Sequence, residues 1–335
     1  MANTPLVEIS RGGVVESVHY GHAVICNGAG EMVASWGNPQ LAIYPRSSAK
    51  MIQALPLITS GAADAMGLGS RQFALACASH NGAAIHTDPV QRWLGDLGLD
   101  DDALRCGSHD PKDRTAMHGL ILDGKTPCQI HNNCSGKHAG FLSLAQHLKA
   151  GPDYIEIDHP VQRAVKQTTE EVAGEDTQGW AVDGCSAPNF RLSLSGLARS
   201  MAYFATAHTR SDVSSSAAER LRTAMMAHPE LVAGEGRACT NIMRACAGAA
   251  AVKTGAEGVF IAILPEKGLG VALKISDGAT RASECAIATI LELLGVLPHE
   301  AAASLVATPV TNCRNITTGQ VTPSAAFVND LKAAL

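Results

Sequence analysis

Ser47 and Lys50 stand three residues apart, directly before the apolar run from Met51 to Ile58. If this segment begins a helix, the two side chains share one face, and the Ser47 hydroxyl can meet the Lys50 amine. A serine hydroxyl becomes a good nucleophile when a neighbouring base takes its proton, and a desolvated lysine amine can be that base. The alternative interpretation is a serine that caps a helix and a lysine on its surface.

Two further motifs follow in the chain, Ser79-x-Asn81 and Lys253-Thr254-Gly255. Ser79 and Lys253 would form a second hydroxyl–amine pair, able to pass a proton to a departing amine. Two neighbouring lysines each disfavour the other's charge, which lowers the pKa of the amines towards the working pH. The alternatives are a turn after a helix at Ser79 and a turn before a strand at Lys253. In this order the three motifs resemble the signature set of penicillin-binding proteins, serine β-lactamases and related glutaminases.

The segment from His131 to His138 combines a thiol at Cys134 with an amine at Lys137, and Asp183-Gly184-Cys185 follows downstream. A cluster of thiolate, imidazole and amine at the start of a helix suits a soft divalent metal such as zinc. The alternative is a set of unreactive loop residues.

The elements that must position these motifs are strands at both ends of the chain and helices between them. Short apolar runs in residues 5–36 indicate strands that are separated at Gly12-Gly13, at Gly21 and by a hairpin turn at Asn27-Gly28. Two more strands are expected near the other end, at Val259–Leu264 and Gly270–Ile275. Helices are expected at 51–58, 71–78, 87–97, 131–148, 158–172, 193–206, 214–227, 238–249 and 283–294. Residues 100–130 are polar and glycine-rich, so a loop is expected there.

This order of elements predicts an α+β fold. The sheet is expected to be largely antiparallel because its strands come in hairpins, and a helical section is inserted between its two halves. We expect a single domain over residues 1–335, with a sheet portion of about 1–46 and 250–335 and a helical portion of about 47–249.

Composition describes a globular protein, with 46% hydrophobic and 17% charged residues in a chain of 335. A net charge of −5 gives no electrostatic reason to expect a nucleic-acid partner. No apolar run approaches the roughly 20 residues that span a bilayer, and the first residues lack the pattern of a secretory signal. Ten cysteines without paired spacing suit a reducing compartment. We therefore expect a cytoplasmic protein without a membrane partner.

Four segments of the chain are similar to the asparaginase II family of bacterial L-asparaginases, the Rhizobium-type class. These segments are Tyr44–Lys50, Ala78–Gly82, His131–Gly140 and Asp183–Pro188. The resemblance spans nearly the whole chain, and it implies a homodimeric cytosolic amidohydrolase with a β-lactamase-like fold. It also implies two Ser–Lys tandems, which fall here on Ser47/Lys50 and Ser79/Lys253. Lys267 and Lys274 are the alternatives for the second lysine.

The family carries a zinc ion held by two cysteines and a lysine, which fall here on Cys134, Lys137 and Cys185. A lysine amine binds a metal only when its proton is displaced, so such a site would depend strongly on pH. The resemblance implies one Zn2+ per subunit, near the chemistry, with a positioning or scaffolding role. Asp183 would be either an outer partner of this site or the anchor of the substrate ammonium.

The function expected from the resemblance is hydrolysis of L-asparagine to L-aspartate and ammonia through an acyl-enzyme on Ser47. Charge complementarity makes Arg46 the candidate for the substrate α-carboxylate, and we place Asn133 and His138 among the substrate-binding residues. The alternatives are a glutaminase, whose substrate is one methylene longer, and a penicillin-recognising serine hydrolase or esterase. A zinc-binding protein without catalytic activity is the alternative from another functional class.

Overall fold

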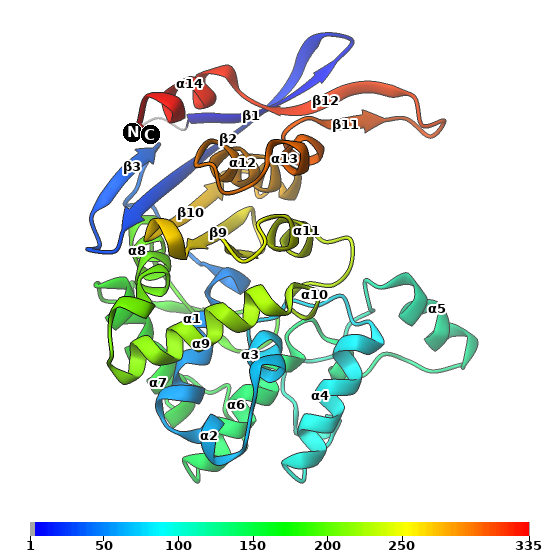
Figure 1. Ribbon diagram of the computed structural model, residues 1–335. Helices are drawn as coiled ribbons and strands as arrows, with labels where there is room; N and C mark the ends of the chain where they lie inside the picture. The colour runs from blue at the N-terminus through cyan, green and yellow to red at the C-terminus, as the bar shows by residue number, and fades with distance from the viewer. Residues whose placement is uncertain (1–3, 335) are drawn as a thin grey trace. The chain divides into compact units, whose positions relative to one another are not determined.

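The computed structural model describes residues 4–334, which cluster into two compact units (Figure 1). The first unit comprises the residues up to Ser48, the segment Leu192–Thr206 and the residues from Ile242 on. The second unit comprises Ala49–Arg191 and Ala207–Asn241. The expectation of a single domain stays a prediction.

The first unit is built on an antiparallel sheet. Its strands are β1 (Thr4–Arg11), β2 (Val14–Asn27), β3 (Met32–Trp36), β8 (Ala251–Thr254), β9 (Val259–Leu264), β10 (Leu269–Ile275), β11 (Thr308–Thr311) and β12 (Thr317–Pro323). Their order is β11-β12-β1-β2-β10-β9-β8, and β3 also pairs with β2. Figure 1 shows the blue N-terminal strand β1 beside the orange-red strand β12. The expected α+β class, with one sheet built from both ends of the chain, is confirmed.

Helices cover the central strands of this sheet. They are α8 (Leu194–Ala205), α12 (Thr280–Leu293), α13 (His299–Val306) and α14 (Ala325–Ala334). α8 packs on β2, β9 and β10, whereas α12 packs on β1, β9, β10 and β12. Every residue of β9 is buried, so both faces of the sheet are covered there. Gly270 permits the close approach of α8, because a Cβ at this position would collide with the backbone of Ala202.

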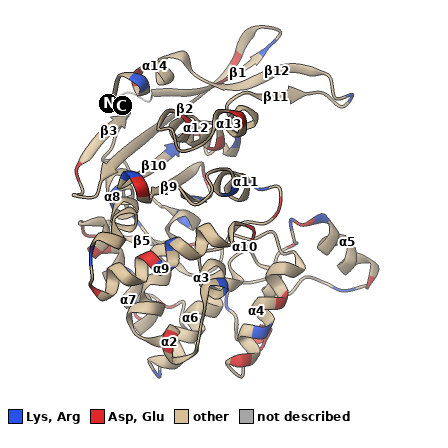
Figure 2. Ribbon diagram, in the orientation of Figure 1, with Lys and Arg blue, Asp and Glu red and all other residues tan. Residues whose placement is uncertain are grey.

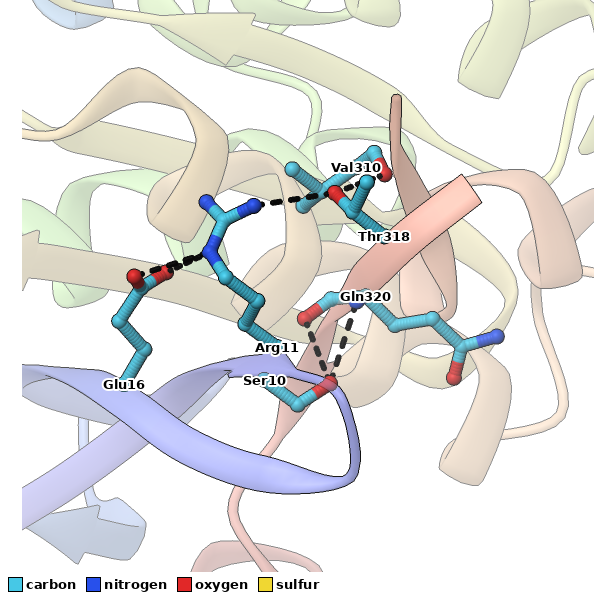
Figure 3. Close-up of polar contacts among 6 residues, drawn as sticks. All are labelled: Ser10, Arg11, Glu16, Val310, Thr318 and Gln320. Atoms are coloured by element: carbon cyan, nitrogen blue, oxygen red, sulfur yellow. Dashed lines mark hydrogen bonds and ion pairs between the residues drawn. The ribbon is translucent and has the colours of Figure 1, made fainter. Parts of the chain in front are cut away.

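Side chains also link the β1–β2 hairpin to β12 (Figure 3). The Arg11 guanidinium lies 2.9 Å from the Glu16 carboxylate and donates to the Thr318 hydroxyl at 3.1 Å. The Ser10 hydroxyl accepts a hydrogen bond of 3.1 Å from the Gln320 N–H. These groups are exposed, so their contribution to stability is small beside that of the backbone ladder.

The second unit is mainly helical. Its helices are α1 (Lys50–Thr59), α2 (Ala62–Ala65), α3 (Ser70–Ala76), α4 (Ala84–Asp96), α5 (Arg114–Leu122), α6 (Ser135–His147), α7 (Pro160–Ala173), α9 (Val213–Ala227) and α10 (Pro229–Val232). A short hairpin of β5 (Trp180–Val182) and β6 (Pro188–Phe190) completes it, and α11 (Ala238–Ala245) leads the chain back into the first unit. α1 packs against α6, α7 and α9 and is buried from Lys50 to Ile58, so it forms the core of this unit.

Three expectations about elements are wrong. The predicted loop over residues 100–130 contains α5, none of whose residues is buried; the Asp113 carboxylate caps this helix by accepting from the Ala116 N–H at 2.8 Å. α4 begins at Ala84 and includes Pro89, so the helix does not start near Thr87. β2 continues through Gly21 as one strand. A Cβ there would lie 2.6 Å from the Lys274 carbonyl oxygen, so this glycine permits close strand packing and does not break the strand.

Basic and acidic residues are dispersed over the elements of both units, as Figure 2 shows. Across residues 4–334, no helix is long and apolar enough to cross a membrane.

Candidate active site and thiol–amine cluster

Ser47 lies in a short 3-10 turn, η1 (Arg46–Ala49), which leads directly into α1. The strand β4 (Ala42–Ile43) pairs with β7 (Leu192–Ser193) and fixes the chain that enters the turn. Arg46 has a φ of +53°, in the left-handed region that side-chain-bearing residues rarely adopt. The Ser48 hydroxyl and N–H donate to the Pro45 carbonyl oxygen at 2.6 and 3.2 Å and close the turn. Ser47 is therefore held, half-buried, on a strained and tightly hydrogen-bonded support.

The Lys253-Thr254-Gly255 motif lies against this turn. Lys253 and Thr254 end the strand β8, so the motif belongs to the sheet and is not a turn before it. A Cβ at Gly255 would lie 2.6 Å from the Pro45 carbonyl oxygen and 3.3 Å from the Ser48 nitrogen. Only glycine allows the two backbones to approach this closely. The first unit therefore brings the third motif directly beside the backbone of the first.

The three candidate lysines of the first unit differ in burial and position. Lys253 is fully buried, and its amine donates to the Thr254 carbonyl oxygen at 2.8 Å. Lys267 is exposed in the turn η5 (Pro265–Lys267), and Lys274 on β10 donates to the Glu257 carbonyl oxygen at 2.7 Å. Its burial and its closeness to the Ser47 turn favour Lys253 among the three.

In the second unit, Lys50 and Ser79 lie together. Lys50 is 1% exposed, and its amine donates to the Ser79 hydroxyl at 3.0 Å and to the Ala78 carbonyl oxygen. Ser79 follows α3, and its N–H donates to the Val232 carbonyl oxygen at 2.8 Å. The sequence pairs Lys50 with Ser47, whereas this contact joins it to the serine of the second motif. A buried amine bonded to a hydroxyl can exchange a proton with it.

His80 anchors the Ser79-His80-Asn81 loop between α3 and α4, a role that no sequence motif indicates. Its Nε2 lies 2.9 Å from the Ser135 hydroxyl, its Nδ1 accepts from the Gly82 N–H at 3.2 Å, and its backbone N–H donates to the Asn133 carbonyl oxygen at 3.2 Å. Burial, together with the stacked ring of His86, lowers the pKa of His80 well below its ordinary value of 6.5. His80 is therefore a neutral hydrogen-bonding bridge.

Cys134, Lys137 and Cys185 meet in one buried cluster of the second unit. Cys134 and Lys137 come from the start of α6, and Cys185 comes from the turn between β5 and β6. The Lys137 amine donates to the Cys185 sulfur at 3.0 Å, and the Cys134 thiol donates to the Asn133 side-chain oxygen at 2.9 Å. The three predicted metal ligands are thus brought together.

Electrostatics in this cluster favour one thiolate beside one ammonium. The hydrogen bond between the two thiols, supported by the Lys137 charge, lowers the pKa of Cys185 well below its usual range and raises that of Cys134. Burial opposes the charge on Lys137, but the neighbouring sulfur atoms outweigh it and raise the pKa of its amine. Among the described residues, no group of three His, Cys, Asp or Glu side chains could hold a metal. The donor set of two sulfurs and one nitrogen fits zinc, provided that Lys137 loses a proton on binding.

The remaining candidates for substrate binding in the second unit have different surroundings. Asn133 is half-buried, and its N–H donates to His109 Nε2 at 2.9 Å. His138 is fully buried, with Nδ1 lying 2.9 Å from the Tyr154 hydroxyl. Asp183 is half-buried and accepts from the Gly184 N–H at 2.8 Å. In the first unit, the Arg46 guanidinium lies 4.0 Å from the carboxylate of Glu257, a residue that no sequence motif indicated.

Comparisons with solved structures give weak similarities. The protein Mglu in its native form is 12% identical, with 88% of this chain and 69% of that chain covered and a TM-score of 0.48. Its tris and glutamate form gives the same identity and TM-score, with 64% of that chain covered. A candidate beta-lactamase from Bacteroides dorei is 10% identical, with 81% of this chain and 93% of that chain covered and a TM-score of 0.44.

No curated protein sequence matches the chain. The model of the L-asparaginase II family, in contrast, matches residues 7–323, which include all three motifs and the thiol–amine cluster. The chain therefore belongs to the L-asparaginase II family, and it is an amidohydrolase.

Proposed function

We propose that the chain hydrolyses L-asparagine to L-aspartate and ammonia through an acyl-enzyme on Ser47. The observation that carries this proposal is the hydrogen bond of 3.0 Å between the buried Lys50 amine and the Ser79 hydroxyl, in a member of an amidohydrolase family. Amide hydrolysis needs one group to take the proton of the nucleophile and another to protonate the departing amine. A buried amine in contact with a hydroxyl supports such a proton relay.

In the first step, the Ser47 oxygen bonds to the side-chain amide carbon while its proton passes to Lys50. Backbone N–H groups at the start of α1, including that of Ser47, would stabilise the tetrahedral oxyanion. The carbon–nitrogen bond then breaks, and Ser79 with Lys253 helps to return a proton to the departing ammonia. Water next attacks the ester carbon, its proton is taken by the same base, and L-aspartate leaves as the Ser47 oxygen regains a proton.

Substrate binding in this proposal begins with Arg46, which is 28% exposed beside Ser47 and would hold the α-carboxylate. We propose that Asn133, His138 and Asp183 also contribute to substrate binding, as the sequence predicts. Cys134, Lys137 and Cys185 would hold the zinc ion, which when bound would supply a positive charge that orients the substrate and ties α6 to the β5–β6 turn. We also propose that the chain acts as a cytoplasmic homodimer.

Ammonia release by the purified protein tests this function, with L-asparagine, L-glutamine and a chromogenic cephalosporin as parallel substrates. We expect preference for L-asparagine over L-glutamine by about 10- to 200-fold, the range for one methylene in a fitted pocket. Ser47→Ala and Ser79→Ala should each lower kcat by at least about 100-fold, whereas Ser216→Ala, an exposed serine on α9, should leave it unchanged.

Near-normal turnover in both Ser47→Ala and Ser79→Ala would refute the proposed mechanism. Cephalosporin turnover without ammonia release would indicate the penicillin-recognising alternative. An acylating probe separates the remaining possibility, because an enzyme should be modified at Ser47 and a zinc-binding protein without activity should not.

A further inference from the structure

An exposed pair of opposite charges lies beside the Ser47 turn in the first unit. The Arg46 guanidinium and the Glu257 carboxylate are 4.0 Å apart, with 28% and 68% of their side chains exposed. Arg46 immediately precedes Ser47, and Glu257 lies two residues beyond Gly255, which packs on the same turn. Both charges are therefore near the proposed nucleophile and accessible to a small molecule.

The position of Glu257 is fixed by several independent contacts. Its φ is +58°, so it is a second side-chain-bearing residue in the left-handed region, as Arg46 is. Its carbonyl oxygen accepts a hydrogen bond of 2.7 Å from the Lys274 amine. Gly278 makes room for its carboxylate, because a Cβ there would lie 2.9 Å from Glu257 Oε2.

The backbone strain at Arg46 and Glu257 costs more free energy than an exposed ion pair contributes to stability. Each left-handed residue of this kind costs on the order of 1–3 kcal/mol, whereas an exposed ion pair contributes about 0–1 kcal/mol. Stability alone does not account for the arrangement. Strained residues that the surrounding structure holds in place are concentrated at binding and catalytic sites.

We propose that Arg46 and Glu257 together form the subsite for an α-amino-acid head group, with Arg46 binding the α-carboxylate and Glu257 the α-ammonium. The inference rests on the proposed function and adds a specificity-determining residue to it. In an α-amino acid the two charged groups are attached to one carbon, so they form a compact pair of opposite charges. Arg46 and Glu257 present the opposite charges close together on one surface: the guanidinium can bind the α-carboxylate, and the carboxylate can bind the α-ammonium.

This assignment differs from the expectation that Asp183 anchors the ammonium. Asp183 belongs to the second unit, and its carboxylate accepts from its neighbour Gly184. Variants of Glu257 and Asp183 can be distinguished with a substrate that keeps the amide and the carboxylate but lacks the ammonium. Succinamic acid has this structure, so a residue that binds only the ammonium should not affect its hydrolysis.

The experiment compares Glu257→Gln with Glu266→Gln, an exposed glutamate in η5, and with Asp183→Asn. We expect Glu257→Gln to lower kcat/KM for L-asparagine by about tenfold or more, the effect of losing a hydrogen bond to a charged group, and to leave succinamic acid hydrolysis unchanged. Glu266→Gln should match the unmodified protein on both substrates.

Equal losses on both substrates, no loss on either, or a selective loss in Asp183→Asn alone would overturn the assignment. Calorimetric binding of L-aspartate and of succinate provides a readout that does not need turnover. If the unmodified protein releases no ammonia from any amide, the proposed function fails. The subsite stands in that case only if Glu257→Gln weakens L-aspartate binding about tenfold and leaves succinate binding unchanged.

Discussion

Replacing Gly255 by alanine tests whether the contact between β8 and the Ser47 turn matters for the chemistry. The added Cβ would lie 2.6 Å from the Pro45 carbonyl oxygen, so the backbones must separate by 0.4 Å to reach 3.0 Å and by 0.8 Å to reach the ordinary distance of 3.4 Å. Overpacking of this kind costs about 1–3 kcal/mol of unfolding free energy. A shift approaching 1 Å in a reacting group lowers the rate by about 10- to 100-fold.

The corresponding loss of thermal stability is small. With about 2.1 cal/mol/K of unfolding entropy per residue, a chain of 335 residues carries about 700 cal/mol/K, so about 2 kcal/mol lowers Tm by about 3 °C. Steady-state ammonia release and a thermal melt measure the two effects. Gly95→Ala is the matched control, because a Cβ there meets no atom within 4 Å, and it should leave kcat unchanged.

The two measurements distinguish two ways in which this prediction can be wrong. An unchanged Tm together with unchanged activity would show that the close approach at Gly255 is wrong. A lower Tm with unchanged kcat would confirm the contact but contradict the role of Ser47 as the nucleophile, because displacement of its turn would not have changed the rate.

Two further predictions concern the second unit. Because burial lowers the pKa of His80 below 6.5, the unfolded chain binds a proton that the folded chain does not, and this contribution to stability is lost as pH falls below 6.5. Urea unfolding should therefore lose less stability between pH 7 and 5 in His80→Asn than in the unmodified protein, and parallel losses would contradict the assignment. Cys185→Ser should remove most of the zinc measured by elemental analysis, whereas Cys106→Ser, a buried cysteine whose thiol donates to the Gln129 carbonyl oxygen, should retain it; equal zinc contents in the two variants would contradict the proposed ligand set.

Local sequence signals predicted several elements correctly, because their information lies within the element itself. The turn predicted at Asn27-Gly28 does join β2 to β3, and the apolar runs of β9 and β10 lie where their composition indicates. The prediction of a strand break at Gly21 is wrong because the role of this glycine depends on a residue far away in the sequence. It allows the close approach of the Lys274 carbonyl oxygen on β10. α5 has no buried residue and lies within a polar, glycine-rich stretch, so composition predicts a loop there.

The candidate site likewise contains residues that local patterns predict and contacts that depend on distant parts of the chain. Motif spacing and the family resemblance predict Ser47 as the nucleophile, which stays a prediction, and the resemblance also points to the cysteines and the lysine that meet at the start of α6. The contact of Lys50 with Ser79 joins two motifs 29 residues apart, and its geometry depends on how α1 and α3 pack. Glu257 could not be found by pattern, because its position depends on a left-handed backbone and on Lys274 and Gly278.

The pairing of β2 with β10 has a consequence for how the chain matures during synthesis. His22 on β2 pairs with Lys274 on β10, so the middle of the sheet waits for about 250 residues to be translated. The second unit lies mostly within Ala49–Arg191, which leaves the ribosome long before β10 does. The early strands must therefore stay unpaired on one side, with exposed apolar edges, for most of translation. Shielding by chaperones should matter most in this interval, and slow translation of the last third of the chain should favour aggregation.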